Sequence, residues 1–216
     1  MASLRIKYQT LELGEFDIHL RTLRDDQQFA DPAGKAGALG ISTANWSLFG
    51  VVWRSGRVLA EHMLDFDVAD KRVLEVGCGI GLASLVLNAR ESDITATDYH
   101  PEVEGYLAQN VALNRGRTIP FFRSDWADTD SGMGRFDLII GSDLLYERDH
   151  ADLLSTFVAS HAAPVCEVVI VDPRRGYHAR FSALMQEQGF SFDKTVVHGE
   201  AEDGSRYHVV LISYRR

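Results

Sequence analysis

Residues 72–84 read RVLEVGCGIGLAS, a short β-branched run followed at once by three glycines and the start of a helical pattern. The run RVLEV is typical of a strand that is buried on both faces of a parallel sheet. Gly77, Gly79 and Gly81 let the chain turn tightly and bring backbone N–H groups close to a ligand at the N-terminus of the next helix. A glycine-rich turn can also be a turn without a ligand, so its neighbours have to be considered with it.

Three features beside the glycine loop narrow the kind of ligand. The spacing is GxGxG, and Leu82 stands where a dinucleotide-binding GxGxxG fingerprint has its third glycine. Glu75 ends the strand, where a carboxylate suits a cationic group and repels a pyrophosphate. Asp98 lies 21 residues after Gly77, where a carboxylate takes the two ribose hydroxyls. Together these features favour a nucleoside ligand that carries positive charge and no phosphate.

Strand-like and helix-like stretches alternate from residue 71 onward. The strand-like runs are 72–76, 93–97, 119–122, 136–140 and 167–171, and the helix-like stretches are 82–90, 101–114, 147–161 and 174–188. Strands spaced by helices predict βαβ units and a parallel sheet with helices on both faces. Two further strands, 190–198 and 206–214, are joined only by GEAEDGS, too short for a crossover helix, so they pair antiparallel. We therefore predict an α/β fold: a Rossmann-like, doubly wound sheet of seven strands, mostly parallel, with an antiparallel C-terminal hairpin.

The N-terminal part of the chain has a different pattern. Residues 5–23 alternate on both sides of Gly14, which predicts a β-hairpin, and residues 25–40 are rich in Gly, Ala and Asp, which indicates a loop. A helical pattern follows at 55–64. We divide the chain into an N-terminal hairpin and loop extension, residues 1–45, and an α/β domain, residues 46–216.

Composition excludes several classes of protein. The 216 residues are 45% hydrophobic and 25% charged, as in one globular domain. Cys78 and Cys166 form no CxxC pair, which favours a reducing compartment. The start has no apolar signal region and no stretch is apolar enough to span a membrane, so we expect a cytoplasmic protein. The eight histidines show no HxH or HExxH spacing, and we expect no metal site.

The net charge is −9, from 31 acidic and 22 basic side chains. Such a surface repels nucleic-acid phosphates and suits a cationic partner. A solvated face that aids solubility is an equally good explanation of the charge.

The glycine loop with Glu75 and Asp98 resembles motif I and its acidic partner in the class I, seven-stranded S-adenosylmethionine-dependent methyltransferases. The family's sheet also ends in an antiparallel hairpin, and the resemblance extends over residues 46–214. It implies that Glu75 faces the methionine amino group of the cofactor, that residues 77–81 wrap its methionine portion, and that Asp98 holds its ribose. Three residues that flank these motifs are expected to line the same site: Cys78, Tyr99 and Ser142.

The stretch SDWAD, residues 124–128, follows the third strand. Members of the family commonly have an acidic residue here near the adenine amino group, which implies that role for Asp125, and Trp126 would pack on the base. The alternative is a helix N-cap at Ser124 or Asp125 with Trp126 in the core.

Two further stretches indicate a branch of the family. WSLFGVVWRSGRVLAEHML, residues 46–64, resembles the W-x-S/A-G-x-x-L-A segment of the family-16 protein-lysine methyltransferases, which would make Trp53 a cofactor contact rather than only a buried aromatic. Residues 143–146, DLLY, match the D-x-x-Y motif of that family. Relatives that methylate nucleic acids or glutamine carry two prolines where Leu144 and Leu145 stand, which argues against such substrates.

Most characterised members of this branch methylate protein lysines, and some methylate histidine. By this resemblance Asp143 docks the acceptor amine and Tyr146 shapes the acceptor pocket. The alternative is that Asp143 caps a helix beginning near Glu147 and that Tyr146 is ordinary packing. In DPRRG, residues 172–176, Arg174 or Arg175 is a candidate substrate contact on the same sheet edge.

The sequence thus predicts an S-adenosylmethionine-dependent methyltransferase that modifies a lysine of a protein substrate, most simply as a monomer. A small-molecule amine N-methyltransferase is the alternative among enzymes, because the same acidic pocket would accept a free amine. A catalytically inert cofactor-binding regulatory protein is the alternative from another class. A nicotinamide-dependent oxidoreductase is disfavoured by Leu82.

Overall fold

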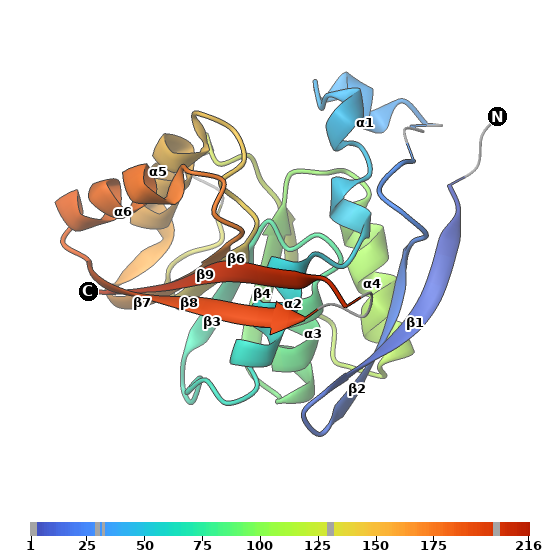
Figure 1. Cartoon of the computed structure of the whole chain (residues 1–216), viewed down its shortest axis with the longest axis horizontal. Helices are drawn as coiled ribbons and strands as arrows, with labels where there is room; N and C mark the ends of the chain where they lie inside the picture. The colour runs from blue at the N-terminus through green and yellow to red at the C-terminus, as the bar shows by residue number, and fades with distance from the viewer. Residues whose placement is uncertain (1–3, 29–30, 32, 129–131, 201–203) are drawn as a thin grey trace.

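A computed structural model describes residues 4–28, 31, 33–128, 132–200 and 204–216 (Figure 1). Its main sheet has seven strands in the order β5-β4-β3-β6-β7-β9-β8. The strands are β3 (Arg72–Val76), β4 (Asp93–Asp98), β5 (Phe121–Arg123), β6 (Phe136–Ser142), β7 (Ala162–Asp172), β8 (Ser191–Glu200) and β9 (Arg206–Arg215). Strands β3 to β7 run parallel, and β9 runs antiparallel to both β7 and β8. The predicted sheet and its C-terminal hairpin are therefore confirmed.

Helices cover both faces of this sheet. On one face lie α2 (Arg54–His62), α3 (Leu82–Ala89) and α4 (Val103–Leu113), and on the other α5 (His150–His161) and α6 (His178–Glu187), which lie together at the left of Figure 1. Successive residues of β6 show why its centre is apolar on both faces: Leu138 and Ile140 pack in one core and Ile139 in the other. No helix among the described residues is long and apolar enough to cross a lipid bilayer.

The N-terminal hairpin consists of β1 (Ile6–Leu13) and β2 (Phe16–Leu23), a separate two-stranded sheet that lies beside α4 (Figure 1). Its apolar face, including Ile18 and Leu20, packs into the same core as α3 and α4. The open edge of β2 is satisfied by α4, where Asn110 and Asn114 accept the backbone N–H groups of Arg21 at 2.7 Å and of His19 at 2.8 Å. The hairpin thus shares its core with the rest of the chain.

Two helices begin later than the sequence predicts. α5 begins at His150 instead of residue 147, and α6 at His178 instead of residue 174. The backbone is left-handed at Asp143 (φ 59°) and Arg174 (φ 69°), a conformation that a right-handed helix excludes. Loops 143–149 and 173–177 consequently form at the carboxyl edge of the sheet. The helix-capping alternative for Asp143 is wrong.

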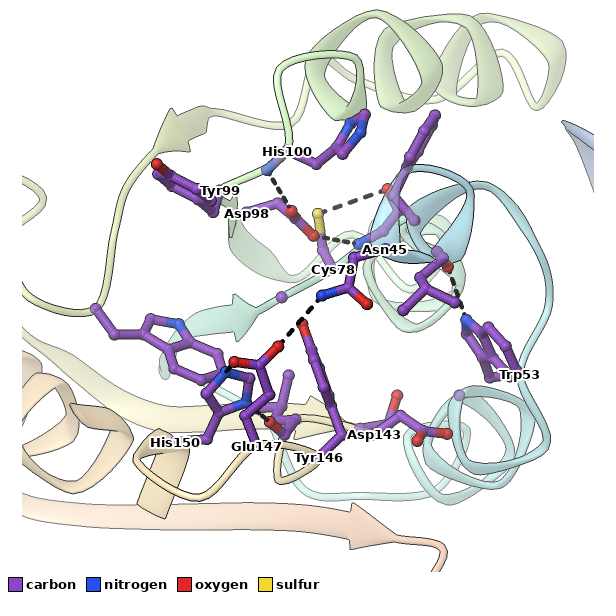
Figure 2. A pocket seen from close by; sticks show the side chains of 18 of the residues that line it. Asn45, Trp53, Cys78, Asp98, Tyr99, His100, Asp143, Tyr146, Glu147 and His150 are labelled. Carbon is purple, nitrogen blue, oxygen red and sulfur yellow. Dashed lines mark hydrogen bonds and ion pairs between the residues drawn. The ribbon is translucent and has the colours of Figure 1, made fainter. Parts of the chain in front are cut away.

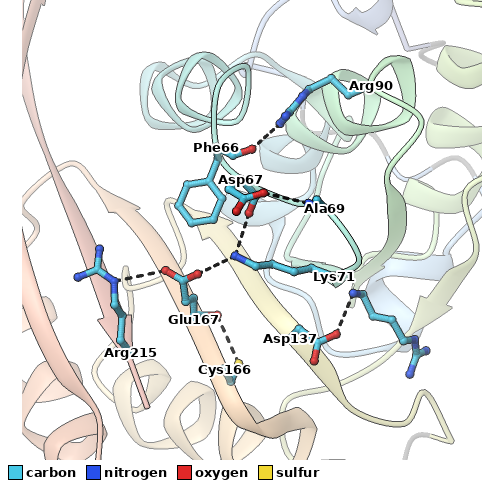
Figure 3. A network of polar contacts seen from close by, with 10 residues as sticks. Phe66, Asp67, Ala69, Lys71, Arg90, Asp137, Cys166, Glu167 and Arg215 are labelled. Atoms are coloured by element: carbon cyan, nitrogen blue, oxygen red, sulfur yellow. Dashed lines mark hydrogen bonds and ion pairs between the residues drawn. The ribbon is translucent and has the colours of Figure 1, made fainter.

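A network of charges ties three strands, β7, β8 and β9, to the segment before β3, away from that edge (Figure 3). Glu167 on β7 contacts Lys71 Nζ at 2.8 Å and Arg215 Nε at 3.3 Å, and Arg215 Nη1 contacts Asp193 Oδ2 at 2.9 Å. Lys71 also donates to the carbonyl of Asp67 at 2.8 Å. Because Glu167 and Lys71 are only 27% and 23% exposed, this pair is screened less than an open surface pair.

Glu167→Gln is expected to lower the free energy of unfolding by about 1 kcal/mol at low salt, because two cations lose their shared carboxylate. Urea unfolding at low and at high salt measures the loss, which should shrink as salt rises. Asp193→Asn is the matched control: its side chain is 80% exposed, so the change should cost about 0.3 kcal/mol or less. Equal losses for the two variants would contradict this account of the network.

Candidate functional site

A cavity of about 520 Å³ opens at the carboxyl ends of β3, β4 and β6 (Figure 2). The strand order reverses between β3 and β6, and such a switch point is where open α/β sheets bind ligands. Twelve of the residues predicted from the sequence line this cavity: Trp53, Glu75, Gly77, Cys78, Gly79, Asp98, Tyr99, Asp125, Trp126, Ser142, Asp143 and Tyr146. The fold therefore brings both predicted groups of side chains, the cofactor set and the acceptor pair, to one place.

The glycine loop forms the floor of the cavity. Gly77 has φ 60° and Gly79 has φ 53°, a conformation that favours glycine. A Cβ atom on Gly77 would stand 2.5 Å from Leu144 Cδ2, and one on Gly79 would stand 2.8 Å from the carbonyl oxygen of Phe49. Glycine is therefore required at both positions by the neighbouring atoms as well as by the backbone conformation.

Gly81 has a different surrounding. It is the N-cap of α3 with φ 74°, and a Cβ there would stand 2.4 Å from Leu107 Cδ1 on α4. Gly81 does not line the cavity, so its position serves the packing of α3 against α4. The sequence pattern groups all three glycines together because it carries no information on which way each one faces.

Asp98 connects β4 to the glycine loop. Its Oδ2 accepts the N–H of Gly79 at 2.9 Å, and its Oδ1 accepts the N–H of His100 at 2.8 Å (Figure 2). The pKa of Asp98 is raised overall, because the effect of burial exceeds the opposing effect of these hydrogen bonds. Each oxygen keeps a second lone pair for a hydroxyl donor in the cavity. Asp98 can therefore hold the loop and a ribose at the same time.

Glu75 lies at the end of β3 and is 4% exposed. Its Oε2 accepts the backbone N–H of Ser84 at 2.8 Å and also the Ser84 hydroxyl, which leaves Oε1 for a group in the cavity. Burial raises the pKa of Glu75 to about 7. A cationic group beside Oε1 would favour the ionised form and lower that pKa.

Cofactor affinity is expected to rise with pH because of Glu75. Below pH 7 a growing fraction of Glu75 is protonated and cannot pair with an ammonium, so S-adenosylhomocysteine should bind roughly tenfold more tightly at pH 7.5 than at pH 6. The stability of the free protein changes with pH in the opposite direction to the cofactor affinity. The raised pKa makes the free energy of unfolding fall as the pH rises from 4.5 to about 7. Calorimetry at both pH values measures the affinities.

Glu75→Gln provides the control for this pH dependence. The amide oxygen can still accept from Ser84, so the loop should persist, whereas the titrating charge is gone. The variant should bind more weakly at pH 7.5 and show little change between the two pH values. An unchanged pH dependence would place the responsible group elsewhere.

The side walls come from segments far apart in the sequence. Trp53 donates its Nε1–H to the carbonyl of Leu48 at 2.8 Å, which fixes the indole at the edge of the cavity (Figure 2). Asn45 donates to Glu147 Oε1 at 3.2 Å and thereby joins the segment before α2 to the loop after β6. Tyr99 donates its hydroxyl to the carbonyl of Leu39 at 2.8 Å.

Asn45, Phe49 and His100 are among the lining side chains that the sequence analysis missed. Phe49 stacks on His100 with ring centroids 4.1 Å apart, and burial lowers the pKa of His100 to about 4, so the ring is neutral at pH 7. His100 lies two residues after Asp98, which is a usable signal. Asn45 belongs to a stretch without any periodic pattern, and only the folded chain brings it to the site.

The turn at residues 124–128 differs from the helix-cap alternative. Asp125 Oδ1 accepts the N–H of Ala127 at 3.0 Å within a turn, and no helix follows in residues 124–128 or 132–135. The capping alternative for Ser124 and Asp125 is therefore wrong for the described residues. Trp126 packs edge-on against His150, with ring centroids 5.1 Å apart.

The loop after β6 carries the predicted acceptor pair. Asp143 and Tyr146 face Asp98 and Cys78 across the cavity (Figure 2). Asp143 Oδ1 lies 2.6 Å from Arg175 Nη1, and its side chain is 12% exposed. The pKa of Asp143 is raised overall, because the effect of burial exceeds the opposing effect of the Arg175 charge. The carboxylate thus faces the cavity while one of its oxygens is paired within the chain.

Tyr146 is held in place by His150. The two rings meet edge to face with centroids 4.4 Å apart, and His150 Nδ1 lies 2.8 Å from the carbonyl oxygen of Leu144. Burial, followed by the negative charges of Asp98 and Glu147, raises the pKa of Tyr146 to about 12. Its hydroxyl stays protonated at neutral pH and can donate a hydrogen bond.

The charges of the cavity favour a cationic ligand. Carboxylates line it on every side: Glu75, Asp98, Asp125, Asp143, Glu147 and Asp149. Among the lining residues that the structure describes, Arg175 is the one lysine or arginine. The volume suits a small molecule, and the bare glycine loop with Glu75 and Asp98 fits a nucleoside that carries an ammonium. A polyphosphate does not fit this set of groups.

Comparison with known proteins gives a family. Residues 39–188 match the model of a family described as lysine methyltransferase. The chain is 28% identical to protein N-lysine methyltransferase METTL21A of Danio rerio over 73% of this chain and 76% of the relative. It is 30% identical to the electron transfer flavoprotein beta subunit lysine methyltransferase of Rattus norvegicus, over 60% of this chain and 51% of the relative. It is 34% identical to histidine protein methyltransferase 1 homolog of Dictyostelium discoideum, over 44% of this chain and 32% of the relative.

Solved structures agree on the fold. The 16S rRNA N2 G1207 methyltransferase of Thermus thermophilus, in complex with AdoMet and guanosine, superposes with a TM-score of 0.69 at 16% identity, covering 100% of this chain and 52% of that one. Magnesium protoporphyrin IX methyltransferase of Synechocystis, with bound SAM, gives 0.60 at 19% identity, covering 89% and 97%.

Proposed function

The chain belongs to the lysine methyltransferase family, and we propose that this S-adenosylmethionine-dependent methyltransferase acts on a lysine side chain of a protein. One observation carries the choice of acceptor: the carboxylate of Asp143, 12% exposed, lines the cavity beside Tyr146 at the end of β6. A carboxylate there can accept a hydrogen bond from an amine and hold its nitrogen in line for reaction.

The chemistry defines what the surrounding residues have to do. When bound, S-adenosylmethionine supplies a methyl group on a positively charged sulfur. Transfer to nitrogen is a direct displacement, so the protein must chiefly align the two partners. An ammonium has no lone pair, and a lysine with pKa ~10.4 is neutral in about one molecule in 10³ at pH 7. Asp143 would therefore orient the amine, and the ring and hydroxyl of Tyr146 would narrow the entrance for it.

Charge and relatives support a protein lysine. The net charge of −9 and the carboxylates of the cavity suit a cationic acceptor and disfavour nucleic acid. The relative named for N-lysine methylation in Danio rerio spans 73% of this chain, and the relative named for histidine spans 44% of it.

Labelling of lysate proteins tests the acceptor. The enzyme is incubated with radiolabelled S-adenosylmethionine and lysate, and label is measured in protein, nucleic-acid and small-molecule fractions. We expect label in protein, recovered as methyl-lysine after hydrolysis and lost when lysines are first blocked by reductive dimethylation. Label that survives blocking and appears as methylhistidine would mean that the acceptor is histidine and not lysine. Label in the small-molecule fraction would favour the amine N-methyltransferase.

We also propose that the enzyme works in the cytoplasm and as a monomer. Cys78 and Cys166 are free and buried, which suits a reducing compartment. Cell fractionation and light scattering test these two proposals, and a stable dimer or a membrane-bounded location would contradict them.

A further inference from the structure

Arg175 lies in the loop between β7 and α6 and reaches the carboxylate that the proposed function assigns to the acceptor. Its Nη1 is 2.6 Å from Asp143 Oδ1, and its side chain is 42% exposed. Asp143 Oδ1 is buried, and Asp143 and Arg175 both line the cavity. The same carboxylate is therefore shared between the cavity and a permanent cation of this chain.

A bare carboxylate creates a difficulty for amine methylation. At about 4 Å and an effective dielectric constant of ~20, one negative charge raises the pKa of an amine by about three. The carboxylate that binds the amine well would then keep it protonated and unreactive. A guanidinium on the far side, about 6 Å from the amine, lowers the same pKa by about two under the same assumptions. Since Arg175 is partly exposed, solvent should reduce this effect to about one.

We propose that Arg175 is a positioning residue: its guanidinium neutralises Asp143, so that the carboxylate orients the acceptor amine without stabilising the protonated ammonium. The inference rests on the proposed function, because it assumes an amine acceptor.

The backbone holds Arg175 in place for this task. Arg174 and Gly176, on either side, have φ 69° and 102°, and the N–H of Arg174 donates to Asp172 Oδ1 at 2.6 Å. Asp172 is anchored at the end of β7 with its side chain 1% exposed. The guanidinium is therefore presented by a turn that is itself tied to a buried carboxylate.

Other charges near Asp143 do not replace Arg175. Asp172 raises the pKa of Asp143, and Ser55 on α2 lowers it. His178 on α6 faces Asp172 at 3.6 Å, and Arg54 on α2 turns to Ser205 Oγ at 2.9 Å. The groups across the cavity are acidic or neutral: Glu75, Asp98, Glu147 and Tyr146. Arg175 is thus the permanent cation beside Asp143 in the described part of the cavity.

The first test measures the pair directly and needs no substrate. Carboxyl-labelled aspartate is titrated by NMR in the wild type and in Arg175→Gln, with Asp143→Asn to assign the signal. We expect the pKa of Asp143 to rise by about one or more in Arg175→Gln and to stay near the wild-type value in Arg175→Lys. Arg174→Gln is the matched control: of the two arginines that the sequence offered as substrate contacts, only Arg175 lines the cavity, and Arg174 carries an equal charge at the neighbouring exposed position. An Asp143 signal that titrates identically in all variants would overturn the inference.

The second test measures the pH profile of methyl transfer to the proteins of a cell lysate. Arg175→Gln should be about tenfold slower than the wild type at pH 7.5 and within about twofold of it at pH 9.5, where the amine loses its proton more readily. Arg175→Lys should restore the profile, and Arg174→Gln should keep it.

Other roles for Arg175 predict different pH profiles. An equal loss at both pH values would mean that Arg175 is only structural, and faster transfer at pH 7.5 would mean that it competes with the substrate for Asp143. Either result overturns the inference. A wild-type enzyme that labels no lysine at any pH would refute the proposed function and with it the positioning role, while the NMR titration would still report the ion pair.

Discussion

Asp143→Asn is expected to reduce methyl transfer by about 100-fold or more while leaving the melting temperature and the cofactor affinity almost unchanged. Asn is close to Asp in size and tolerates the left-handed backbone at this position, φ 59°. The variant therefore keeps the loop after β6. The amide carries no charge to hold the acceptor, and it leaves the guanidinium of Arg175 uncompensated beside the amine. Both effects act on the bound acceptor and not on the cofactor.

The measurement combines thermal unfolding, calorimetry with S-adenosylhomocysteine and radiolabel transfer to lysate proteins. Asp93→Asn is the control, because it removes an equal charge from the opposite end of a strand in the same sheet, where the side chain is 64% exposed. It should keep wild-type turnover. Asp143→Ala is less informative, since alanine is strained at a positive φ. If Asp143→Asn retained wild-type turnover, the acceptor pocket would lie elsewhere along this sheet edge.

Gly79→Ala is expected to weaken cofactor binding by about 100-fold or more and to lower the melting temperature. The left-handed conformation, φ 53°, costs a residue with a Cβ about 1–2 kcal/mol. The added carbon would also stand 2.8 Å from the carbonyl oxygen of Phe49, a backbone atom that cannot rotate away. Relief of this clash moves the N–H of Gly79 away from Asp98 Oδ2, which it meets at 2.9 Å. The loop and the ribose-binding carboxylate would be displaced together.

Gly105→Ala is the matched control for this substitution. Gly105 lies in α4, is exposed, and has no atom within 4 Å of an added Cβ. The change should raise the free energy of unfolding by about 0.5–1 kcal/mol, because alanine loses less backbone entropy in a helix, and should leave cofactor affinity alone. Calorimetry with S-adenosylhomocysteine on both variants provides the comparison. Affinity within threefold of the wild type for Gly79→Ala would show that the cofactor does not rest on this loop.

The order of the strands and helices along the chain, and the edge of the sheet at which the chemistry lies, could be predicted from the sequence. A strand buried on both faces has to be mostly apolar, as 72–76 and 136–140 are apart from Arg72, Glu75 and Asp137, and a parallel crossover needs a helix. Both constraints act over short stretches of the chain, so the pattern of residues along the sequence reveals them. Polar residues that follow such strands, including Glu75, Asp98 and Asp143, consequently come together at one edge.

The partners that these residues contact could not be predicted, because they come from distant parts of the folded chain. Asn45 bonds Glu147 at a separation of 102 residues, and Arg175 pairs with Asp143 across two loops whose left-handed turns leave no mark in the sequence pattern. The same holds for Gly81, which faces Leu107 instead of the cavity. Periodicity reports which side of an element is apolar, whereas contacts between distant loops depend on how whole layers pack. The charge that surrounds the acceptor carboxylate is therefore a property of the folded chain.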